Sequence, residues 1–369
     1  MSALPQFLEA RDGSVAISPR DDVAAVLLGT GVVGGALLRL LATPFAAGVR
    51  LVGIANSTRQ FADADGFAAN SAALSLRAAE PGREDDALLA ALQQSGATRR
   101  VVIDATASHA TAARHADWLA AGFDVVTANK AAAAGPNETS SALRNASARG
   151  GTYGDAATVG AGLPVLSTVR RLRACGDELI ALEGVFSGSL SWLFSQYDGS
   201  RPFSALLREA HAFGYTEPDP RLDLGGVDVV RKLVILARAA GRSIDADDVE
   251  VENLVPSSLS ECDVPTFLAQ AGEIDAAMEN RRADAASQGR VLRHLAAFDA
   301  NGVARVGLVA VAPEHPAARL SGTDNLFALT TSRYRTRPLV IQGPGAGAEV
   351  TAQALLGDLL ALQPARCAA

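Results

Sequence analysis

The sequence is poor in the residues that build several common kinds of site. Its 369 residues include only three cysteines, Cys175, Cys262 and Cys367, which lie far apart and form no Cys-x-x-Cys pair. Neither a disulfide framework nor a zinc site is therefore predicted. The five histidines lack the spacing of metal ligands, and no G-x-S-x-G motif indicates a serine hydrolase. We expect a reduced, cytoplasmic protein.

The chain also lacks an excess of basic residues and long hydrophobic runs. Its formal net charge is -7 and its pI is about 5.3, whereas a nucleic acid or an anionic membrane must be matched by clustered cations. No uninterrupted run of about 18 apolar residues is present, and residues 1–20 contain no apolar stretch of signal-peptide length. These absences predict an enzyme for a small molecule, with neither nucleic acid nor membrane as a partner.

Apolar segments of strand length alternate with alanine-rich helical patterns in the first part of the chain. Such alternation is typical of an α/β fold in which right-handed crossovers build a parallel sheet. We therefore predict a Rossmann-type, doubly wound parallel sheet. The expected strands are Val23–Leu28, Leu51–Ala55, Val101–Ala105 and Val125–Ala128, and the expected helices include Asp86–Gln94 and Thr111–Ala121.

The pattern changes after Gly160 and predicts a second, α+β domain. Longer strands are expected at Leu179–Phe186 and Ala304–Val311, with helices around Phe203–Phe213 and Val227–Ala240. A glycine-rich turn then precedes a helix that is expected to return to the first domain. The predicted division is an N-terminal extension at residues 1–20, a Rossmann domain at 21–158, a substrate-binding domain at 159–338 and a C-terminal helix at 339–369.

Another glycine-rich turn, near the start of the chain, follows the first predicted strand and begins the next helix. It fits the G-x-G-x-x-G motif of dinucleotide-binding proteins and reads Gly29-Thr30-Gly31-Val32-Val33-Gly34. The first glycine permits the tight turn, the second lets a pyrophosphate approach the backbone, and the third lets helix and strand pack closely. The phosphates would lie at the positive end of the helix dipole. The alternative is a glycine turn that binds nothing, but its place between strand and helix favours NAD(P).

The end of the second predicted strand bears on the choice between NAD and NADP. A site specific for NAD usually has a carboxylate there, which accepts a hydrogen bond from the ribose 2′-hydroxyl. This chain has Asn56, Ser57, Thr58 and Arg59 instead. The missing carboxylate and the charge of Arg59 favour NADP, unless Arg59 is an ordinary solvated residue.

Two lysines stand where chemistry is expected. Lys130 follows a predicted strand at its carboxyl end, where open α/β sheets bind their ligands. Lys232 lies on a predicted helix four residues after Asp228, so the two share one face. Taken alone, this pair would be an exposed ion pair worth about 0.2–0.5 kcal/mol. Together, carboxylates and lysines suit an amino-acid substrate, because carboxylates bind its ammonium group and lysines bind its carboxylate or protonate an alkoxide.

The chain resembles homoserine dehydrogenases, specifically the dehydrogenase portion of the bifunctional aspartate kinase–homoserine dehydrogenases. The resemblance is most specific in Gly214–Lys232, where Pro218 and Pro220 restrict the backbone of a turn that carries three carboxylates. It implies NAD(P)-dependent interconversion of L-homoserine and L-aspartate 4-semialdehyde, in threonine and methionine biosynthesis. The matching stretches are Gly29–Gly34, Val52–Ser57, Val125–Lys130, Val159–Val165, Phe186–Ser191, Gly214–Lys232 and Gly343–Gly347.

The resemblance also implies roles for single residues. Lys232 and Lys130 are the implied catalytic lysines, with Lys232 the proton donor to the carbonyl oxygen. The implied substrate-binding residues are Glu217, Asp223, Asp228, Ser189 and Tyr215. In addition to the glycine turn, the residues expected at the cofactor are Asn56, Ser57, Arg59, Thr106, Ala107, Lys130 and Gly347.

The family holds a monovalent cation, usually sodium, on backbone carbonyls, which correspond here to Val159, Ala161 and Leu163. The chain departs from the family pattern at two positions. Ala156 stands where a carboxylate is usual, although Asp155 is one position away. Leu222 stands beside Asp223 where another aspartate is common. The first change bears on the cation site and the second on substrate preference.

Two alternatives stay open. One is a paralogous reductase of another amino-acid semialdehyde, which would keep the lysines and change the pocket around Leu222. The other is a non-catalytic protein that binds NADP. The presence of both Lys130 and Lys232 disfavours it, because a sensor needs only the glycine turn. The resemblance further implies a homodimer formed through the second domain.

Overall fold

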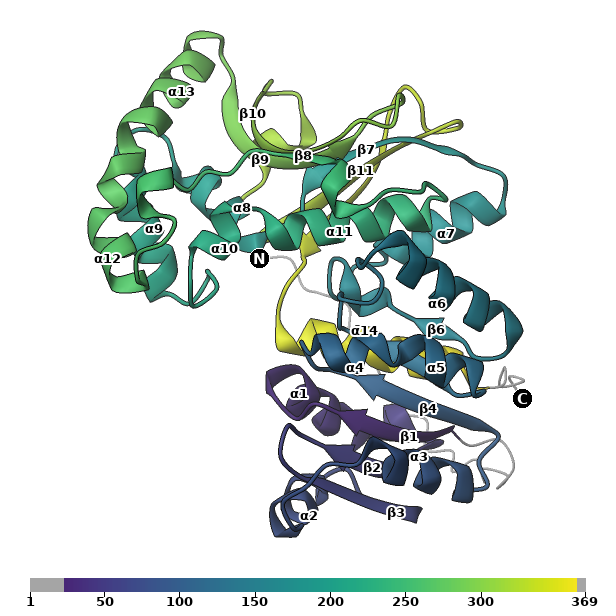
Figure 1. The fold of residues 1–369 in the computed structure, drawn as a ribbon. Coiled ribbons are helices and arrows are strands. Elements are labelled where there is room, and N and C mark those ends of the chain that lie inside the picture. The colour runs from purple at the N-terminus through teal and green to yellow at the C-terminus, as the bar shows by residue number, and fades with distance from the viewer. Residues whose placement is uncertain (1–22, 364–369) are drawn as a thin grey trace, which may run out of the picture.

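The computed structural model describes residues 23–363, so the extension predicted at residues 1–20 lies outside the described residues. The described chain forms two domains, each built around a six-stranded sheet (Figure 1). This arrangement confirms the predicted α/β class with a Rossmann-type sheet and a second domain. None of the helices within residues 23–363 is long and apolar enough to cross a membrane.

The first sheet has the strand order β3-β2-β1-β4-β5-β6, which is that of dinucleotide-binding folds. Its central strands are apolar runs because helices cover both faces of the sheet. Alternate side chains of β1 accordingly enter two different cores, with Ala25 on one face and Val26 on the other. The strands are β1 (Val23–Leu28), β2 (Val49–Ala55), β3 (Gln60–Phe67), β4 (Arg99–Asp104), β5 (Asp124–Thr127) and β6 (Tyr153–Gly154).

The edge strand β3 is the difference from the predicted parallel sheet, because it pairs antiparallel with β2. Its residues are only partly buried or exposed, so it has no apolar run to mark it. The other neighbours pair in parallel. A second difference is that the single helix expected at Thr111–Ala121 is two short helices that meet at Arg114.

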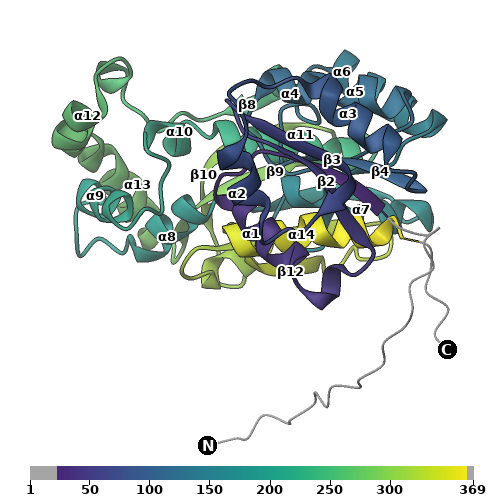
Figure 2. The ribbon, with the colours of Figure 1, turned by 90° about the horizontal axis from the view of Figure 1, so that it is seen from below.

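Helices cover the two faces of this sheet (Figure 2). α1 and α14 contact each other and share one core with β1, whereas α3, α5 and α6 share the opposite core. The helices of this domain are α1 (Val32–Leu41), α2 (Ala72–Ala78), α3 (Asp85–Gln94), α4 (His109–Ala113), α5 (His115–Ala120), α6 (Asn137–Arg149) and α14 (Ala348–Ala361).

The second sheet is mixed, with the order β12-β11-β7-β9-β10-β8. α7, α8 and α11 contribute to the large core on one of its faces, and α9, α12 and α13 form a helical lobe beside it (Figure 1). Its strands are β7 (Leu179–Val185), β8 (Val249–Val251), β9 (Val291–Phe298), β10 (Ala304–Val311), β11 (Asp324–Thr331) and β12 (Leu339–Pro344). Its helices are α7 (Val165–Ala174), α8 (Gly188–Gln196), α9 (Phe203–Ala212), α10 (Arg221–Leu224), α11 (Val227–Ala239), α12 (Val264–Gln270) and α13 (Asp275–Ser287).

The predicted C-terminal segment at 339–369 is shared between the domains. β12 pairs with β11 as an edge strand of the second sheet, and Leu339 and Ile341 pack against its core. After this strand the chain returns, and α14 packs on α1 of the first domain. The chain therefore crosses between the domains twice, and Glu349 in the first turn of α14 pairs with Arg39 of α1.

Candidate active site

The glycine turn after β1 has the shape that a dinucleotide requires. Gly29 has a φ of +95°, where L side chains are strained, and a Cβ at Gly34 would lie 1.9 Å from the Gly29 carbonyl oxygen. A Cβ at Gly31, in contrast, would meet nothing within 4 Å. No side chain caps the start of α1, so its amides face the open space above Gly31. A pyrophosphate fits this turn.

The end of β2 is organised by Asn56, whose Oδ1 accepts hydrogen bonds from the amides of Thr58 and Arg59 at 2.8 Å each. This turn leads Arg59 away from the strand end. The Arg59 guanidinium donates to the Ala79 carbonyl. Arg59 thus does not line the cavity of about 570 Å³ at this place. The cavity is lined by Ser57, Arg83, Glu84, Asp85, Asp86 and Arg114.

Arg83 and Arg114 are therefore the cations at the strand end, and local sequence patterns did not indicate them. Arg83 donates to the Asn56 carbonyl at 3.5 Å and pairs with Asp85 at 2.8 Å. Arg114 pairs with Asp86 at 3.4 Å. Both come from outside the β2 turn, Arg83 from the approach to α3 and Arg114 from the junction of α4 and α5.

The two predicted lysines share one carboxylate. Lys232 Nζ is 2.9 Å from Asp228 Oδ2, and Lys130 Nζ is 3.2 Å from Asp228 Oδ1. Lys232 is only 7% exposed and donates a further hydrogen bond to the Phe186 carbonyl at 2.7 Å. The interpretation of Asp228 and Lys232 as an isolated surface pair is therefore wrong. Desolvation would raise the pKa of Asp228, but Lys232 and Lys130 outweigh it and hold this pKa well below its usual range.

A second carboxylate, Asp223, is held beside this pair. Asp223 Oδ1 accepts from Ser189 Oγ at 2.5 Å, and Oδ2 accepts from the Glu217 amide at 2.8 Å. Burial raises the pKa of Asp223, whereas these two hydrogen bonds oppose the rise. The Glu217 side chain is exposed. Arg221 binds the third carboxylate of the turn, Asp219, at 2.8 Å, so two of the three carboxylates are fixed.

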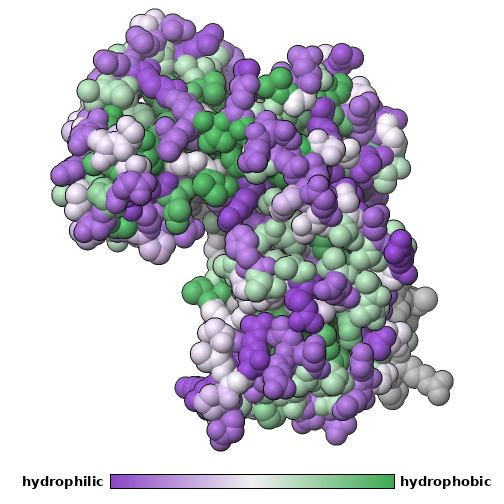
Figure 3. Space-filling view, in the orientation of Figure 1, coloured by the Kyte–Doolittle hydropathy of each residue, from purple (hydrophilic) through white to green (hydrophobic). Residues whose placement is uncertain are grey.

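Arg221 anchors the same turn to the rest of the second domain. Arg221 Nη1 donates to three carbonyls of the segment that leads to α12, those of Leu259, Ser260 and Cys262. The side chain of Leu222, beside Asp223, is 52% exposed. Tyr215 lies among Trp192 and Phe213, with ring centroids 5.5 and 5.6 Å away. Figure 3 shows hydrophobic side chains gathered on the second domain.

A buried polar network that the sequence patterns did not indicate supports Lys130. Asp104, at the end of β4, accepts from the Thr106 amide at 2.8 Å and from Asn129 Nδ2 at 2.9 Å. His115 Nε2 lies 2.9 Å from the same carboxylate, and neither side chain is exposed. The network joins the loops after β4 and β5, so it places Thr106 beside Lys130. Ala107, also predicted here, is exposed in the loop.

The turn before α14 contributes Gly347, the residue before the first turn of this helix, with a φ of +126°. Beside it, a Cβ at Gly345 would lie 2.3–2.6 Å from Asn325 side-chain atoms. Asn325 is fully buried, and its amide has no hydrogen-bond partner among the described residues. Glycine is required here because the turn passes directly over this amide.

The loop predicted to bind a cation has two successive left-handed residues, Gly160 (φ +74°) and Ala161 (φ +50°). Its Leu163 carbonyl already accepts from the Val165 amide at 2.8 Å. Asp155 is bound through both oxygens by Arg170, at 2.6 and 2.7 Å. Asp155 therefore does not supply a free carboxylate in place of Ala156. Residues 23–363 contain no cluster of His, Cys, Asp and Glu side chains that could hold a metal.

Asp358 of α14 lies beside this loop and accepts from the Ala156 amide at 2.9 Å. Burial raises its pKa to about 6, because the ionised form is desolvated next to Asp155. Ionisation of Asp358 therefore lowers the free energy of unfolding as the pH rises from about 4 to about 6. Asp358→Asn, which keeps the acceptor, is expected to be more stable than the parent at pH 7.5 by about 1–3 kcal/mol and equally stable near pH 4.

Thermal unfolding across pH 4–8 measures this difference. Glu349→Gln, at the exposed start of the same helix, is the control and should leave the pH profile unchanged. A parent and an Asp358→Asn protein with parallel profiles would show that Asp358 ionises normally in the folded protein.

Comparisons with known proteins agree over most of the chain. The family model of homoserine dehydrogenase matches residues 164–360, and that of the homoserine dehydrogenase NAD-binding domain matches residues 29–153. The homoserine dehydrogenase of Schizosaccharomyces pombe is 36% identical over 359 residues, which cover 92% of this chain and 95% of that protein. The bifunctional aspartokinase/homoserine dehydrogenase 2 of Escherichia coli is 41% identical over 347 residues, 91% of this chain and 43% of that protein. The chain spans about two fifths of the length of such bifunctional relatives.

Solved structures show the same fold. A protein of unknown function from Candida auris has a TM-score of 0.86 at 32% identity and covers 93% of this chain and 98% of its own. A hyperthermophilic archaeal homoserine dehydrogenase, solved in complex with NADPH, has a TM-score of 0.69 at 18% identity, with coverage of 92% and 97%.

Proposed function

The chain belongs to the homoserine dehydrogenase family, and on that premise we propose that it interconverts L-homoserine and L-aspartate 4-semialdehyde with NAD(P). The observation that carries the proposal is the sharing of Asp228 by Lys130 and Lys232, beside the Asp223 carboxylate. One lysine comes from the nucleotide domain and the other from the second domain, so the pair stands where a cofactor and a substrate would meet.

In the direction of reduction, Lys232 donates a proton to the aldehyde oxygen as the carbon becomes tetrahedral. When bound, the reduced nicotinamide supplies the hydride to that carbon. The Lys232 ammonium stabilises the charge that develops on oxygen, and it is fixed by the Phe186 carbonyl at 2.7 Å. Asp228 remains ionised, so it keeps both lysines in place without taking the proton.

The charged ends of the substrate meet protein groups of opposite charge. Glu217 and Asp223 bind its ammonium group, since Glu217 is exposed and Asp223 is held at the base of the turn by Ser189. Lys130 binds its carboxylate or stands beside the reacting oxygen. The glycine turn, Thr106 and Gly347 are the residues that would hold the dinucleotide, and the open space above Gly31 fits its pyrophosphate.

We propose a preference for NADP that rests on Arg83 and Arg114 rather than on Arg59. Both guanidiniums line the cavity at the end of β2, where a 2′-phosphate would lie and would replace Asp85 and Asp86 as their partners. Arg83→Gln is expected to raise the KM for NADP about tenfold, the loss of roughly one charge-assisted hydrogen bond, and to leave the KM for NAD nearly unchanged. Arg77→Gln, exposed on α2, should change neither value. An equal rise for both cofactors would contradict the assignment.

The activity is tested by following NADP and NAD reduction with homoserine in parallel assays. Homoserine-dependent reduction supports the proposal. Reduction with a different hydroxy amino acid alone would favour the paralogous reductase. A protein that binds NADPH but turns over neither homoserine nor aspartate semialdehyde would be the non-catalytic alternative.

A sodium ion on the carbonyls of Val159, Ala161 and Leu163 belongs to the same proposal. The two left-handed residues of this loop support it, because they turn successive peptides in different directions. With Asp155 bound by Arg170, such a site rests on carbonyls alone. Activity that is identical in sodium and in tetramethylammonium salts would contradict it.

We further propose a homodimer that forms through the second domain, in the cytoplasm, with the enzyme serving threonine and methionine biosynthesis. Val291, Val309 and Val340, on strands of the second sheet, are 40–45% exposed and support an interface there. Light scattering during gel filtration tests the dimer, and a monomeric mass at micromolar concentration would contradict it.

A further inference from the structure

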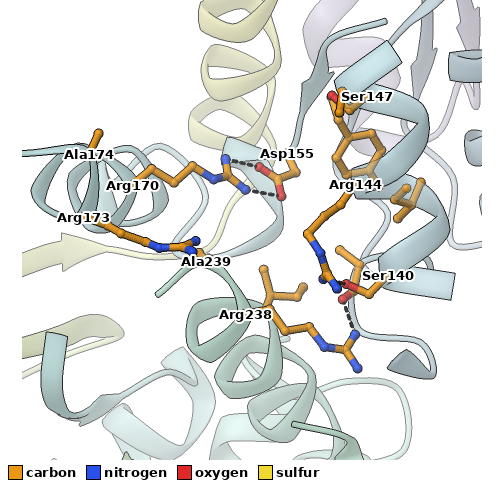
Figure 4. A pocket seen from close by; sticks show the side chains of 14 residues that line it. Ser140, Arg144, Ser147, Asp155, Arg170, Arg173, Ala174, Arg238 and Ala239 are labelled. Carbon is orange, nitrogen blue, oxygen red and sulfur yellow. Dashed lines mark hydrogen bonds and ion pairs between the residues drawn. The ribbon is translucent and has the colours of Figure 1, made fainter. Parts of the chain in front are cut away.

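A further hollow lies between the two domains, and none of the catalytic residues lines it. It has a volume of about 700 Å³ and is lined by α6 of the nucleotide domain and by α7 and α11 of the second domain (Figure 4). The dinucleotide and substrate residues proposed above do not line it. It is therefore a site separate from the proposed active site.

The pocket is cationic although the chain as a whole carries a net charge of -7. Four guanidiniums line it, and two of them are neutralised. Arg170 binds both oxygens of Asp155, and Arg238 pairs with Asp245 at 2.8 Å. Asp155 is the only carboxylate among the lining residues.

The other two guanidiniums, of Arg144 and Arg173, have no carboxylate partner among residues 23–363. Arg144 donates to the hydroxyls of Ser140 and Ser141, at 2.7 and 2.8 Å. Arg173 lies over Gly241, where a Cβ would come within 2.7–2.9 Å of its guanidinium atoms. Figure 4 shows the two side chains on opposite sides of the pocket, one from each domain. Two uncompensated positive charges thus face one space.

The walls between these charges are partly apolar. Leu143, Ile235 and the small side chains of Ala133 and Ala239 line the pocket. The volume also far exceeds the roughly 30 Å³ that one water takes up in the liquid. Because apolar side chains lie between the two positive charges, a short carbon chain with an anionic group at each end matches both the walls and the charges.

We propose that the pocket binds a small organic dianion of the short dicarboxylate class, held between Arg144 and Arg173 across the domain boundary. The guanidinium plane suits bidentate binding of a carboxylate, so each end of the ligand meets a matching group.

Two sets of contacts connect the pocket with the catalytic lysines. Arg238 Nη1 donates to the carbonyls of Ala133 and Gly135, at 2.7 Å each, in the loop that begins at Lys130. Arg238 also belongs to α11, which carries Lys232. Tyr153, in the pocket wall, lies 3.1 Å from His115 Nδ1 of the Asp104 network. Because the ligand would hold the two domains together, its binding is expected to change turnover as well as stability.

The test is calorimetric titration of the full chain with succinate, at constant pH and ionic strength, with acetate as the monoanion control. We expect saturable binding of succinate, and binding of acetate that is at least about tenfold weaker. Arg144→Gln and Arg173→Gln should each lower the affinity for succinate at least about tenfold, because each removes one charge-assisted hydrogen-bonding group. Arg149→Gln, exposed at the end of α6, should bind as the parent does.

Binding within the active site is distinguished by repeating the titration with saturating NADPH and homoserine. The proposal expects succinate affinity to persist in that complex, and succinate to act on kcat rather than only on the KM for homoserine. Absent or unsaturable binding, equal binding of acetate, unchanged affinity in both arginine variants, or displacement by homoserine would each overturn it. The binding readout needs no enzymatic activity, so it stands or falls independently of the proposed reaction.

Discussion

Replacing Lys232 with alanine is expected to lower kcat at least about a hundredfold, within the range of a proton-transfer group, while NADPH affinity stays nearly unchanged. The reason is geometric. The ammonium is fixed by Asp228 at 2.9 Å and by the Phe186 carbonyl at 2.7 Å, on a helix of the second domain, whereas the glycine turn lies on the first. Its removal takes away the proton donor and leaves the dinucleotide site intact.

Single-turnover and steady-state kinetics, together with NADPH titration by fluorescence, measure this effect. Arg231→Ala is the matched control, since it removes the neighbouring cation of the same helix and should retain turnover within about twofold. An equal loss of kcat and of cofactor affinity in Lys232→Ala would show that the residue is structural.

Gly31→Ala is expected to weaken NADPH binding at least about tenfold, which corresponds to about 1.4 kcal/mol, without destabilising the protein. In the structure a Cβ at this position would meet nothing within 4 Å, so the fold has room for it. That same space is where the pyrophosphate must approach the backbone. The methyl group therefore competes with the ligand alone.

Gly35→Ala provides the control for this effect. It also adds a methyl group near the start of α1, and its nearest neighbour would be the Arg39 side chain at 4.0 Å. Its NADPH affinity should match the parent. If Gly31→Ala binds NADPH with unchanged affinity and melts at an unchanged temperature, the pyrophosphate does not lie at this turn.

The parts of the fold that could be predicted from sequence are those determined by local burial. β1 and β10 begin and end at the predicted residues, because one is apolar throughout and the other has a clear strand composition. β3 was missed because an edge strand with exposed Asp63 and a mixed pattern has no apolar signature. The short helices α4 and α5 were merged, since alanine-rich composition does not mark the break at Arg114.

The candidate site was predictable where a motif carries its own spacing, and not where distant segments meet. Lys232 and Asp228 are one helical turn apart, so their contact followed from the sequence. The contact of Lys130 with the same carboxylate depends on how the two domains pack against each other. The same holds for Arg83 and Arg114 at the end of β2, and for the buried contact between Asp104 and His115. Such contacts form between segments whose local sequence carries no sign of them.

The proposed reaction transfers a hydride from a nicotinamide to the aldehyde carbon of aspartate semialdehyde at Lys130 and Lys232. Its most direct test is a turnover with NADPH deuterated at the transferring position, followed by mass spectrometry of the amino acid formed. We predict homoserine that carries a single deuterium at its hydroxyl-bearing carbon, formed at least about a hundredfold more slowly by the Lys232→Ala variant at equal protein concentration. Unlabelled homoserine, or a different labelled amino acid, would contradict the proposed reaction.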